Sequence, residues 1–375
     1  MTAVLAVVTV LAYTHMGQVM STRHRTPQAV SPNLHWAQAW SWWDGEWYVD
    51  IARRGYYFIP HRMSSVAFFP VYPLLIRMVS PLVGGHQVLA GVLVTMGCGI
   101  AAAVMFFVWA HELLGRDKAR TALGLLLAYP CSFYLFGAVY ADAVFLLLAV
   151  SAFVLLEHDR PGGAGLLAAV ATATRPVGLG LVVGLWARAL ERRGLLSRSA
   201  LRAPRRALAE LRPDAGLLLA PLGLLGYCAY LWARFGHPLA FISAQEGWKQ
   251  RPGLRTWLKV EWFDQMLRRP YLDPPHLHLV ANALVAVVAL GLSALVFRRL
   301  GAGYGIFVVA LLFGSALSTT DFIGMGRYVM AAFPIFAVAG DRLQERPALS
   351  RTLLVAGAAL LLVTTELHAR NMLIS

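Results

Sequence analysis

The chain has 375 residues, of which 58% are hydrophobic and only 14% are charged, and its mean hydropathy is +0.60. Soluble domains carry about 25% charged residues, so this composition excludes an ordinary water-soluble domain, and its apolar content excludes a disordered chain. The net charge is +14. Because the cations stand between long apolar runs, membrane topology explains them better than nucleic-acid binding. The composition predicts an all-α integral membrane protein, with no nucleic-acid partner.

Apolar runs long enough to cross a bilayer recur along the whole chain. A spanning helix needs about 20 mostly apolar residues, and about eleven runs approach this length. They are residues 1–20, 87–113, 121–138, 141–157, 164–175, 177–191, 214–233, 278–297, 303–318, 328–340 and 352–369. Pro176 separates two of them, because proline removes a backbone donor and disfavours helix at the preceding residue. The sequence predicts one polytopic membrane domain over residues 1–375.

The positive charges indicate how these helices are oriented. Arginine-rich short loops and a basic linker occur at 115–120, 188–213, 298–300 and 341–351. If the spans alternate, all four segments fall on one side, which the positive-inside rule identifies as cytoplasmic. The opposite side then receives two long loops, 21–86 and 234–277, and we expect these loops to form the active-site face.

The first outer loop contains an aromatic stripe at helical spacing, formed by Trp36, Trp40, Trp43, Trp47 and Ile51. This spacing predicts one helix lying in the membrane interface, where indole rings are stable. On such a helix Asp44 points between Trp40 and Trp47, whereas Glu46 points the other way. A carboxylate among apolar rings is desolvated, which makes it a stronger base. Alternatively, Asp44 N-caps a helix that begins at Gly45, and the two roles are compatible.

Three more charged residues stand at the outer ends of predicted spans. Arg175 lies next to Pro176, where its guanidinium suits a lipid-borne phosphate or, alternatively, reaches ordinary headgroups. Arg327 lies in the glycine-containing segment TTDFIGMGRY and is interpreted in the same way. Asp142 opens an outer-side helix, so capping comes first and a sugar contact second.

The remaining candidates carry weaker signals. Arg54 and His61 follow the aromatic stripe, where they either touch phosphate or form solvated surface. His276 and His278 form an isolated pair to which we assign no metal. The second outer loop mixes basic and aromatic residues, a pattern that fits a lid on anionic lipid and a plain interfacial anchor equally well. Its residues of this kind are Trp248, Lys249, Arg251, Arg255, Trp257, Lys259 and Trp262.

Several short motifs occur in a fixed order, and together they point to a family. They are Trp43-Asp44-Gly45-Glu46, Gly55-Tyr56, Phe68-Phe69-Pro70 with Pro73, Tyr140-Ala141-Asp142-Ala143 with Phe145, Ala173-Thr174-Arg175 with Gly178-Leu179, and Arg327-Tyr328. This series resembles the PIG-V-like mannosyltransferases, which in eukaryotes add the second mannose to GPI anchors. The resemblance implies a GT-C-type bundle, an active site on the outer face and a polyprenyl-phosphate-mannose donor.

The resemblance also implies roles for individual residues. Asp44 corresponds to the catalytic base, and Arg175 to a ligand of the donor phosphate, with Arg327 as a second. The residues expected to line the substrate are Trp43, Glu46, Tyr140 and Asp142, to which we add Arg54 and His61 from their place in the same loop. The family's Arg-Ser-Asn-Gly is Arg175-Pro176-Val177-Gly178 here, so hydrogen bonds from that serine and asparagine are absent.

These residues suggest an inverting transfer. A lipid-phosphate leaving group is already a stable anion, so one base suffices, unlike the carboxylate pair of a hydrolase. Arginines supply the positive charge, so we expect neither a divalent metal nor another cofactor. The acceptor stays open between a glycan, a lipid and a protein. The alternative function is a transporter or flippase for a lipid-linked sugar, which would favour internal repeats and ionisable residues near span centres. The arginine-rich composition suggests a bacterial protein, hence one of the plasma membrane, and the resemblance implies that its active site lies outside.

Overall fold

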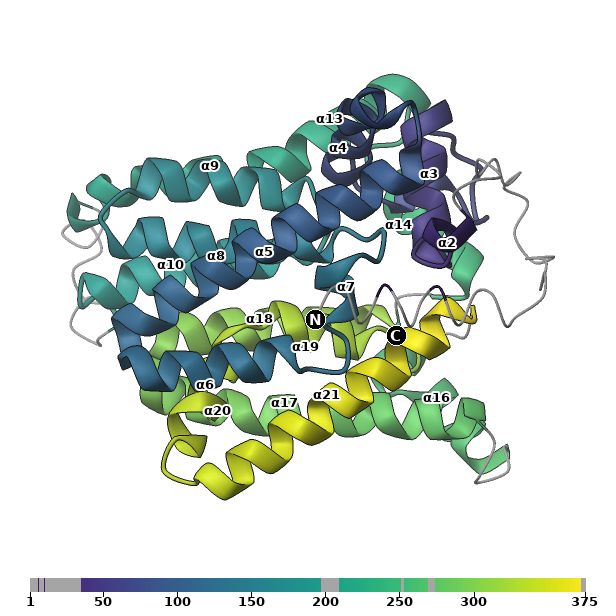
Figure 1. The fold of residues 1–375 in the computed structure, drawn as a ribbon. Coiled ribbons are helices and arrows are strands. Elements are labelled where there is room, and N and C mark those ends of the chain that lie inside the picture. Colours follow the sequence, from purple (N-terminus) through teal and green to yellow (C-terminus); the bar gives the residue numbers. More distant parts are fainter. Residues whose placement is uncertain are drawn as a thin grey trace.

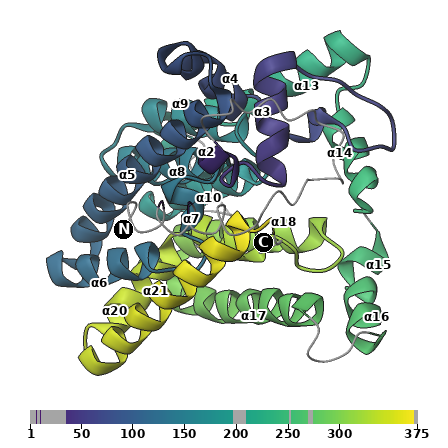
Figure 2. The ribbon, with the colours of Figure 1, turned by 45° about the vertical axis from the view of Figure 1, so that its right-hand side comes forward.

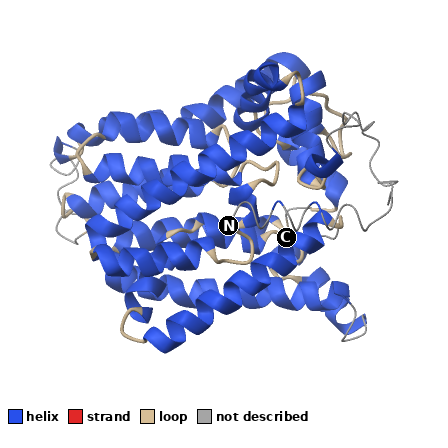
Figure 3. Ribbon diagram, in the orientation of Figure 1, coloured by secondary structure: helices blue, strands red, loops and turns tan. Residues whose placement is uncertain are grey.

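The computed structural model describes Ala6, Val10 and residues 35–196, 209–250, 253–268 and 274–371, so the first predicted span, 1–20, lies almost wholly outside the described residues. The described residues form helices joined by turns and loops, with no strand among them (Figure 3). The all-helical prediction is therefore confirmed for this part of the chain.

The first half of the bundle follows the predicted order of apolar runs. Its helices are α2 (His35–Gln38), α3 (Asp44–Arg54), η2 (Ser65–Ala67), α4 (Val71–Val79), η3 (Ser80–Val83), α5 (Gln87–Leu114), α6 (Arg116–Leu127), α7 (Phe133–Phe136), α8 (Asp142–Glu157), α9 (Pro161–Thr172) and α10 (Gly178–Arg192). The break between α9 and α10 occurs at Pro176, as the sequence predicts. The predicted span 121–138 is wrong, because α6 ends at Leu127 and a turn containing Pro130 separates it from α7.

The second half contains three candidate spans and several short helices. They are η4 (Arg212–Leu219), α13 (Leu222–Phe235), α14 (Ala240–Gln245), η5 (Glu246–Trp248), α15 (Leu254–Trp257), α16 (Val260–Arg268), α17 (Pro274–Leu300), α18 (Ala302–Ser318), α19 (Met325–Ala331), α20 (Pro334–Leu343) and α21 (Pro347–Ala369). The predicted span 328–340 is divided into α19 and α20, because Pro334 begins a new helix and has no backbone N–H to continue α19. The break itself is at Ala332, whose ψ of 52° is not helical.

Four of the described helices are long and apolar enough to cross a membrane. They are Gln87–Leu114, Arg212–Phe235, His276–Leu300 and Pro347–Ala369. Shorter helices pack between them, including α8 and α10, and the total of about eleven spans stays a prediction. Close packing is clearest between α10 and α18, where a β-carbon on Gly184 would come within 2.4 Å of the Phe307 β-carbon. Small residues at such contacts let helices in a membrane approach each other closely.

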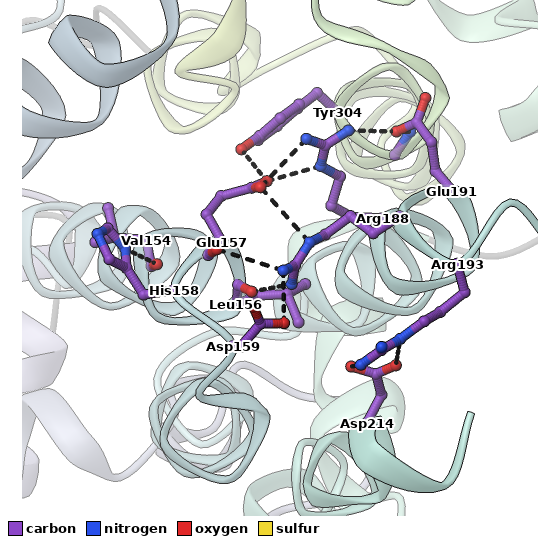
Figure 4. A network of polar contacts seen from close by, with 12 residues as sticks. Val154, Leu156, Glu157, His158, Asp159, Arg188, Glu191, Arg193, Asp214 and Tyr304 are labelled. Carbon is purple, nitrogen blue, oxygen red and sulfur yellow. Dashed lines mark hydrogen bonds and ion pairs between the residues drawn. The ribbon is translucent and has the colours of Figure 1, made fainter. Parts of the chain in front are cut away.

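The basic segments that the structure describes in full, 115–120, 298–300 and 341–351, gather at one end of the bundle, the left-hand end in Figure 1. There Lys118 and Arg299 both pair with Asp341, at 2.6 and 3.6 Å. Glu157, at the end of α8, accepts hydrogen bonds from Arg188 Nε at 2.7 Å and from the Tyr304 hydroxyl at 2.8 Å (Figure 4). This polar network ties α8, α10 and α18 together at the end opposite α3.

Candidate active site

The aromatic segment over residues 36–51 is a broken helix, so the predicted single helix over its stripe is wrong. The chain leaves α2 at Gln38 and enters α3 at Asp44, and Trp43 between them has a left-handed φ of 60°, which is uncommon for a residue with a β-carbon. Tyr140, in the segment before α8, forms hydrogen bonds with backbone groups at the break that a continuous helix would pair internally. Tyr140 Oη donates to Trp42 O at 3.0 Å and accepts from Asp44 N at 3.2 Å.

The indole rings of this segment lie inside the protein rather than in the lipid headgroups. Trp40, Trp42 and Trp47 are buried. The Trp47 ring stacks on Phe68 at 5.5 Å, and Trp42 Nε1 donates to the backbone oxygen of Ala369, in the last turn of α21, at 3.0 Å. Trp47 and Trp42 therefore pack this segment against Phe68 and against the last turn of α21.

Asp44 forms an ion pair with Arg327. It is the first residue of α3, where the positive end of the helix dipole favours a carboxylate. Its Oδ2 accepts from Arg327 Nη1 at 2.8 Å, and the Asp44 side chain is 34% exposed. The carboxylate thus contacts a guanidinium instead of lying desolvated among indoles or capping its own helix.

A second ion pair, between Asp142 and Arg175, is more deeply buried. It too joins the first residue of a helix to an arginine from another segment. Asp142 is the first residue of α8, and Arg175 lies in the break at Pro176. Arg175 Nη1 donates to Asp142 Oδ1, and both side chains are more than nine-tenths buried. The guanidinium carbon of Arg175 lies 5.2 Å from the centre of the Tyr328 ring. Asp142 therefore has a charged partner beyond any capping role.

Helix α19 contacts both pairs, because Arg327 and Tyr328 are neighbours in it. The Arg327 guanidinium carbon lies 5.1 Å from the Tyr140 ring and 5.5 Å from the Tyr134 ring, a geometry in which the cation is attracted to the ring faces. Tyr134 was not among the residues predicted from sequence.

Tyr48 was also missed. It lies one helical turn after Asp44 on α3, a four-residue spacing that the sequence does show. Its ring packs edge-on to Tyr72 at 5.0 Å, and burial raises the pKa of its hydroxyl. The charges of both ion pairs also act on this hydroxyl.

The structure places the other predicted lining residues differently. Glu46 lies in the first turn of α3 and is half-buried. Arg54 ends the same helix, about 15 Å along its axis from Asp44, and pairs with Asp50. His61 Nδ1 pairs with Glu246 Oε2 at 3.0 Å on an exposed loop. The structure therefore brings together Trp43, Asp44, Tyr140, Asp142, Arg175 and Arg327, and sets Arg54 and His61 further along the loop.

Metal ligands do not cluster in the part of the chain that the structure describes. No group of three or more His, Cys, Asp and Glu side chains there could hold a metal ion. His278, from the HxH pair, has its Nε2 within 2.8 Å of Asn282 Nδ2 on the next turn of α17.

Comparisons with known proteins identify the family. A family model described as "Mannosyltransferase (PIG-V)" matches residues 6–233, more than half of the chain. The GPI alpha-1,6-mannosyltransferase 2 of Cricetulus griseus is 30% identical over 204 residues, which cover 50% of this chain and 40% of that protein. The Mus musculus protein of the same name is 29% identical over 231 residues, covering 55% of this chain and 45% of that protein. The chain spans less than half the length of these relatives.

A solved structure shows the fold. The crystal structure of ArnT from Cupriavidus metallidurans, bound to undecaprenyl phosphate, superposes with a TM-score of 0.52 at 13% identity, covering 99% of this chain and 75% of that one. The bundle thus has the architecture of GT-C membrane glycosyltransferases, as the resemblance implies. By its family match the chain belongs to the PIG-V mannosyltransferase family.

Proposed function

We propose that this protein moves mannose from a polyprenyl-phosphate-mannose donor to an acceptor hydroxyl, on the extracytoplasmic face of a bacterial plasma membrane. The observation that carries the proposal is the Asp44–Arg327 pair, a partly exposed carboxylate fixed at a helix start beside a buried guanidinium. It lies at the end of the bundle opposite the basic loops. The family match favours mannose, and the undecaprenyl phosphate bound to the ArnT structure favours a lipid-phosphate donor.

The proposed reaction needs one base and one anion-binding group. Asp44 removes the acceptor hydroxyl proton while that oxygen bonds to the anomeric carbon of the sugar. The bond from this carbon to the phosphate oxygen breaks, and polyprenyl phosphate leaves with the electron pair. Attack from the opposite face inverts the configuration, so a β-linked donor gives an α-mannoside. The acceptor is a hydroxyl of a glycan, a lipid or a protein.

The two arginines stabilise the charge that grows on the leaving phosphate. A guanidinium has five N–H donors, so Arg327 can bind phosphate while one nitrogen stays on Asp44. Its Nε–H is buried and has no partner among the described residues, as in sites whose hydrogen bonding a ligand or water completes. Arg175, held by Asp142 and Tyr328, adds a second fixed positive charge behind the first.

Substitution of Asp44 by asparagine tests the proposal. The purified full chain in liposomes would receive polyprenyl-phosphate mannose and a bacterial membrane extract, and mannose transfer would be measured. Loss of a general base costs about 10²–10⁴-fold in rate, so Asp44→Asn should be nearly inactive. Asp50→Asn is the matched control, because Asp50 is the same residue type on the same helix. Full transfer by Asp44→Asn would overturn the base assignment, and no transfer by the unaltered protein would overturn the function.

A further inference from the structure

One segment of the second outer loop packs both on α3, which begins at Asp44, and on the loop that leads to Arg327. We call it the strap and define it as residues 246–250 and 253–259. Figure 2 shows α14, α15 and α16 following one another down the side of the molecule, away from α3. On the α3 side, the Trp248 ring lies edge-on to Trp47 at 5.4 Å and to Phe68 at 5.9 Å. The strap therefore packs directly on the helix that Asp44 begins.

The other contacts of the strap are with the loop that leads to Arg327. Gln250 Oε1 accepts from Thr320 N at 2.7 Å. Lys259 Nζ donates to the backbone oxygens of Ala316 and Thr319, and it lies 4.7 Å from the centre of the Phe322 ring. The strap thus holds this loop by its peptide groups. Five residues beyond Thr319 the loop ends at Gly324, which precedes α19 and Arg327.

Lys259 is an unusual residue in this position. It is only 7% exposed, although lysines are rarely buried without a partner. Its ammonium faces the carbonyl oxygens at the C-terminal end of α18, where the helix dipole is negative and favours a cation. Burial lowers the pKa of Lys259 to about 8, while the nearby carboxylate of Asp321 acts in the opposite direction. Arg255 and Glu261, the charged groups on either side of Lys259, pair with each other.

The junction of strap and loop is also strained in its backbone. Lys249 and Lys259 in the strap have φ values of 61° and 56°, and Phe322 in the loop has 62°. Left-handed conformations of residues with β-carbons persist only where surrounding structure imposes them, and they concentrate at functional sites. Three of them at one junction indicate that this geometry is closely determined.

We propose that Lys259 and Gln250 are positioning residues for Arg327. By fastening the loop after α18 to a segment that also packs on α3, the strap sets the separation between Arg327 and Asp44. Neither residue touches donor or acceptor in this role. The inference rests on the proposed function and extends it to residues outside the reacting site.

Three substitutions test the strap. Lys259→Met and Gln250→Leu each remove one attachment of the loop, and Lys249→Met is the matched control, because Lys249 is an exposed strap lysine with the same left-handed backbone. Displacing a catalytic group by about 1 Å costs about 100-fold in rate. We therefore expect Lys259→Met and Gln250→Leu to lower kcat/KM for polyprenyl-phosphate mannose by roughly 10- to 100-fold. Gln250→Glu keeps the acceptor oxygen and should restore transfer, whereas Lys249→Met should be unchanged.

The rate of mannose transfer as a function of pH distinguishes a positioning role from a purely structural one, because a purely structural lysine would not change this profile. The donor phosphodiester keeps one charge between about pH 6 and 9, so a fall in transfer as pH rises through about 8 would come from the protein. In Lys259→Arg the guanidinium stays charged at these pH values, so transfer by this variant should not decrease as pH rises through about 8. If Lys259→Arg showed the same fall in transfer above about pH 8 as the unaltered protein, the role of the Lys259 charge would be contradicted.

Hydrogen exchange separates this inference from the proposed function. Backbone amides of residues 319–324 should exchange faster in Lys259→Met and Gln250→Leu than in Lys249→Met, whether or not any mannose is transferred. Faster exchange with unaltered kinetics would overturn the positioning role. Unaltered exchange in Gln250→Leu would overturn the strap itself, even if Lys259→Met fails to fold. An unaltered protein that transfers no mannose would instead overturn the proposed function, and the exchange result would still decide whether the strap holds the loop.

Discussion

Replacing Tyr140 by phenylalanine removes a single oxygen atom. Tyr304, at the opposite end of the bundle, offers a matched control. Tyr140 and Tyr304 are both buried, with 2% and 0% exposure. The Tyr304 hydroxyl accepts from Trp109 Nε1 at 2.9 Å and donates to Glu157 Oε1 at 2.8 Å, so each hydroxyl makes two hydrogen bonds. Each ring also lies under an arginine, at 5.1 Å for Tyr140 and 5.0 Å for Tyr304. Phenylalanine keeps that contact, so only the hydrogen bonds are lost.

The two substitutions should cost similar stability. Leaving a buried donor or acceptor unpaired costs about 1–3 kcal/mol, so losing two hydrogen bonds should lower the free energy of unfolding by about 2–6 kcal/mol in each variant. Their effects on transfer should differ. The Tyr140 hydroxyl bridges Trp42 and Asp44 and fixes the backbone of the proposed base, and a displacement of about 1 Å lowers the rate by about 100-fold. Tyr304 lies near Glu157, about 22 Å along α8 from Asp142, and should leave kcat unchanged.

Thermal unfolding in detergent and initial rates of mannose transfer measure the two quantities on the same samples. We expect Tyr140→Phe and Tyr304→Phe to show comparable falls in Tm, and only Tyr140→Phe to lose kcat. Two results would refute the reasoning. Full kcat in Tyr140→Phe would mean that the hydroxyl does not position Asp44, and equal loss of kcat in Tyr304→Phe would mean that activity only follows stability.

Two further predictions concern the other ion pairs. Asp142→Asn or Arg175→Met alone should lower the free energy of unfolding by about 3–5 kcal/mol, because each leaves a buried unpaired charge, and the double variant should recover much of this loss. Additive losses in thermal unfolding of the double variant would contradict a coupled pair. Glu157→Gln should lower Tm, because it weakens the contacts with Arg188 and Tyr304, without changing kcat. A changed kcat for Glu157→Gln would contradict the placement of the reacting site at the far end.

Local sequence rules predicted the breaks that proline causes. Pro176 separates α9 from α10 and leaves Arg175 in the gap, as expected from the missing backbone donor. Pro334 carries the same signal, but the predicted span 328–340 ran across it, and the structure divides this span at Ala332, between α19 and α20. The apolar runs thus predict where helices occur. They predict where helices end only when proline and glycine are considered as well.

Long-range contacts account for what the sequence did not show. The helical spacing of the tryptophans predicted a continuous helix, but the hydroxyl of Tyr140, 98 residues away from Trp42, takes the backbone groups at the break. In the same way, nothing near Asp44 identifies Arg327 as its partner, because the two are 283 residues apart in the chain. The types of residue in the site were predicted by resemblance, whereas their pairing depends on tertiary structure.

The bond between Trp42 and Ala369 has a consequence for biogenesis. Its two ends are separated by 327 residues. A ribosome adds about 5–20 residues per second, so about 15–65 s pass between synthesis of the segment that carries Asp44 and synthesis of the turn that holds it. Until α21 is inserted, the start of α3 lacks this support and the proposed base is not yet fixed. During its own insertion the protein is therefore a membrane helix bundle without a finished catalytic centre.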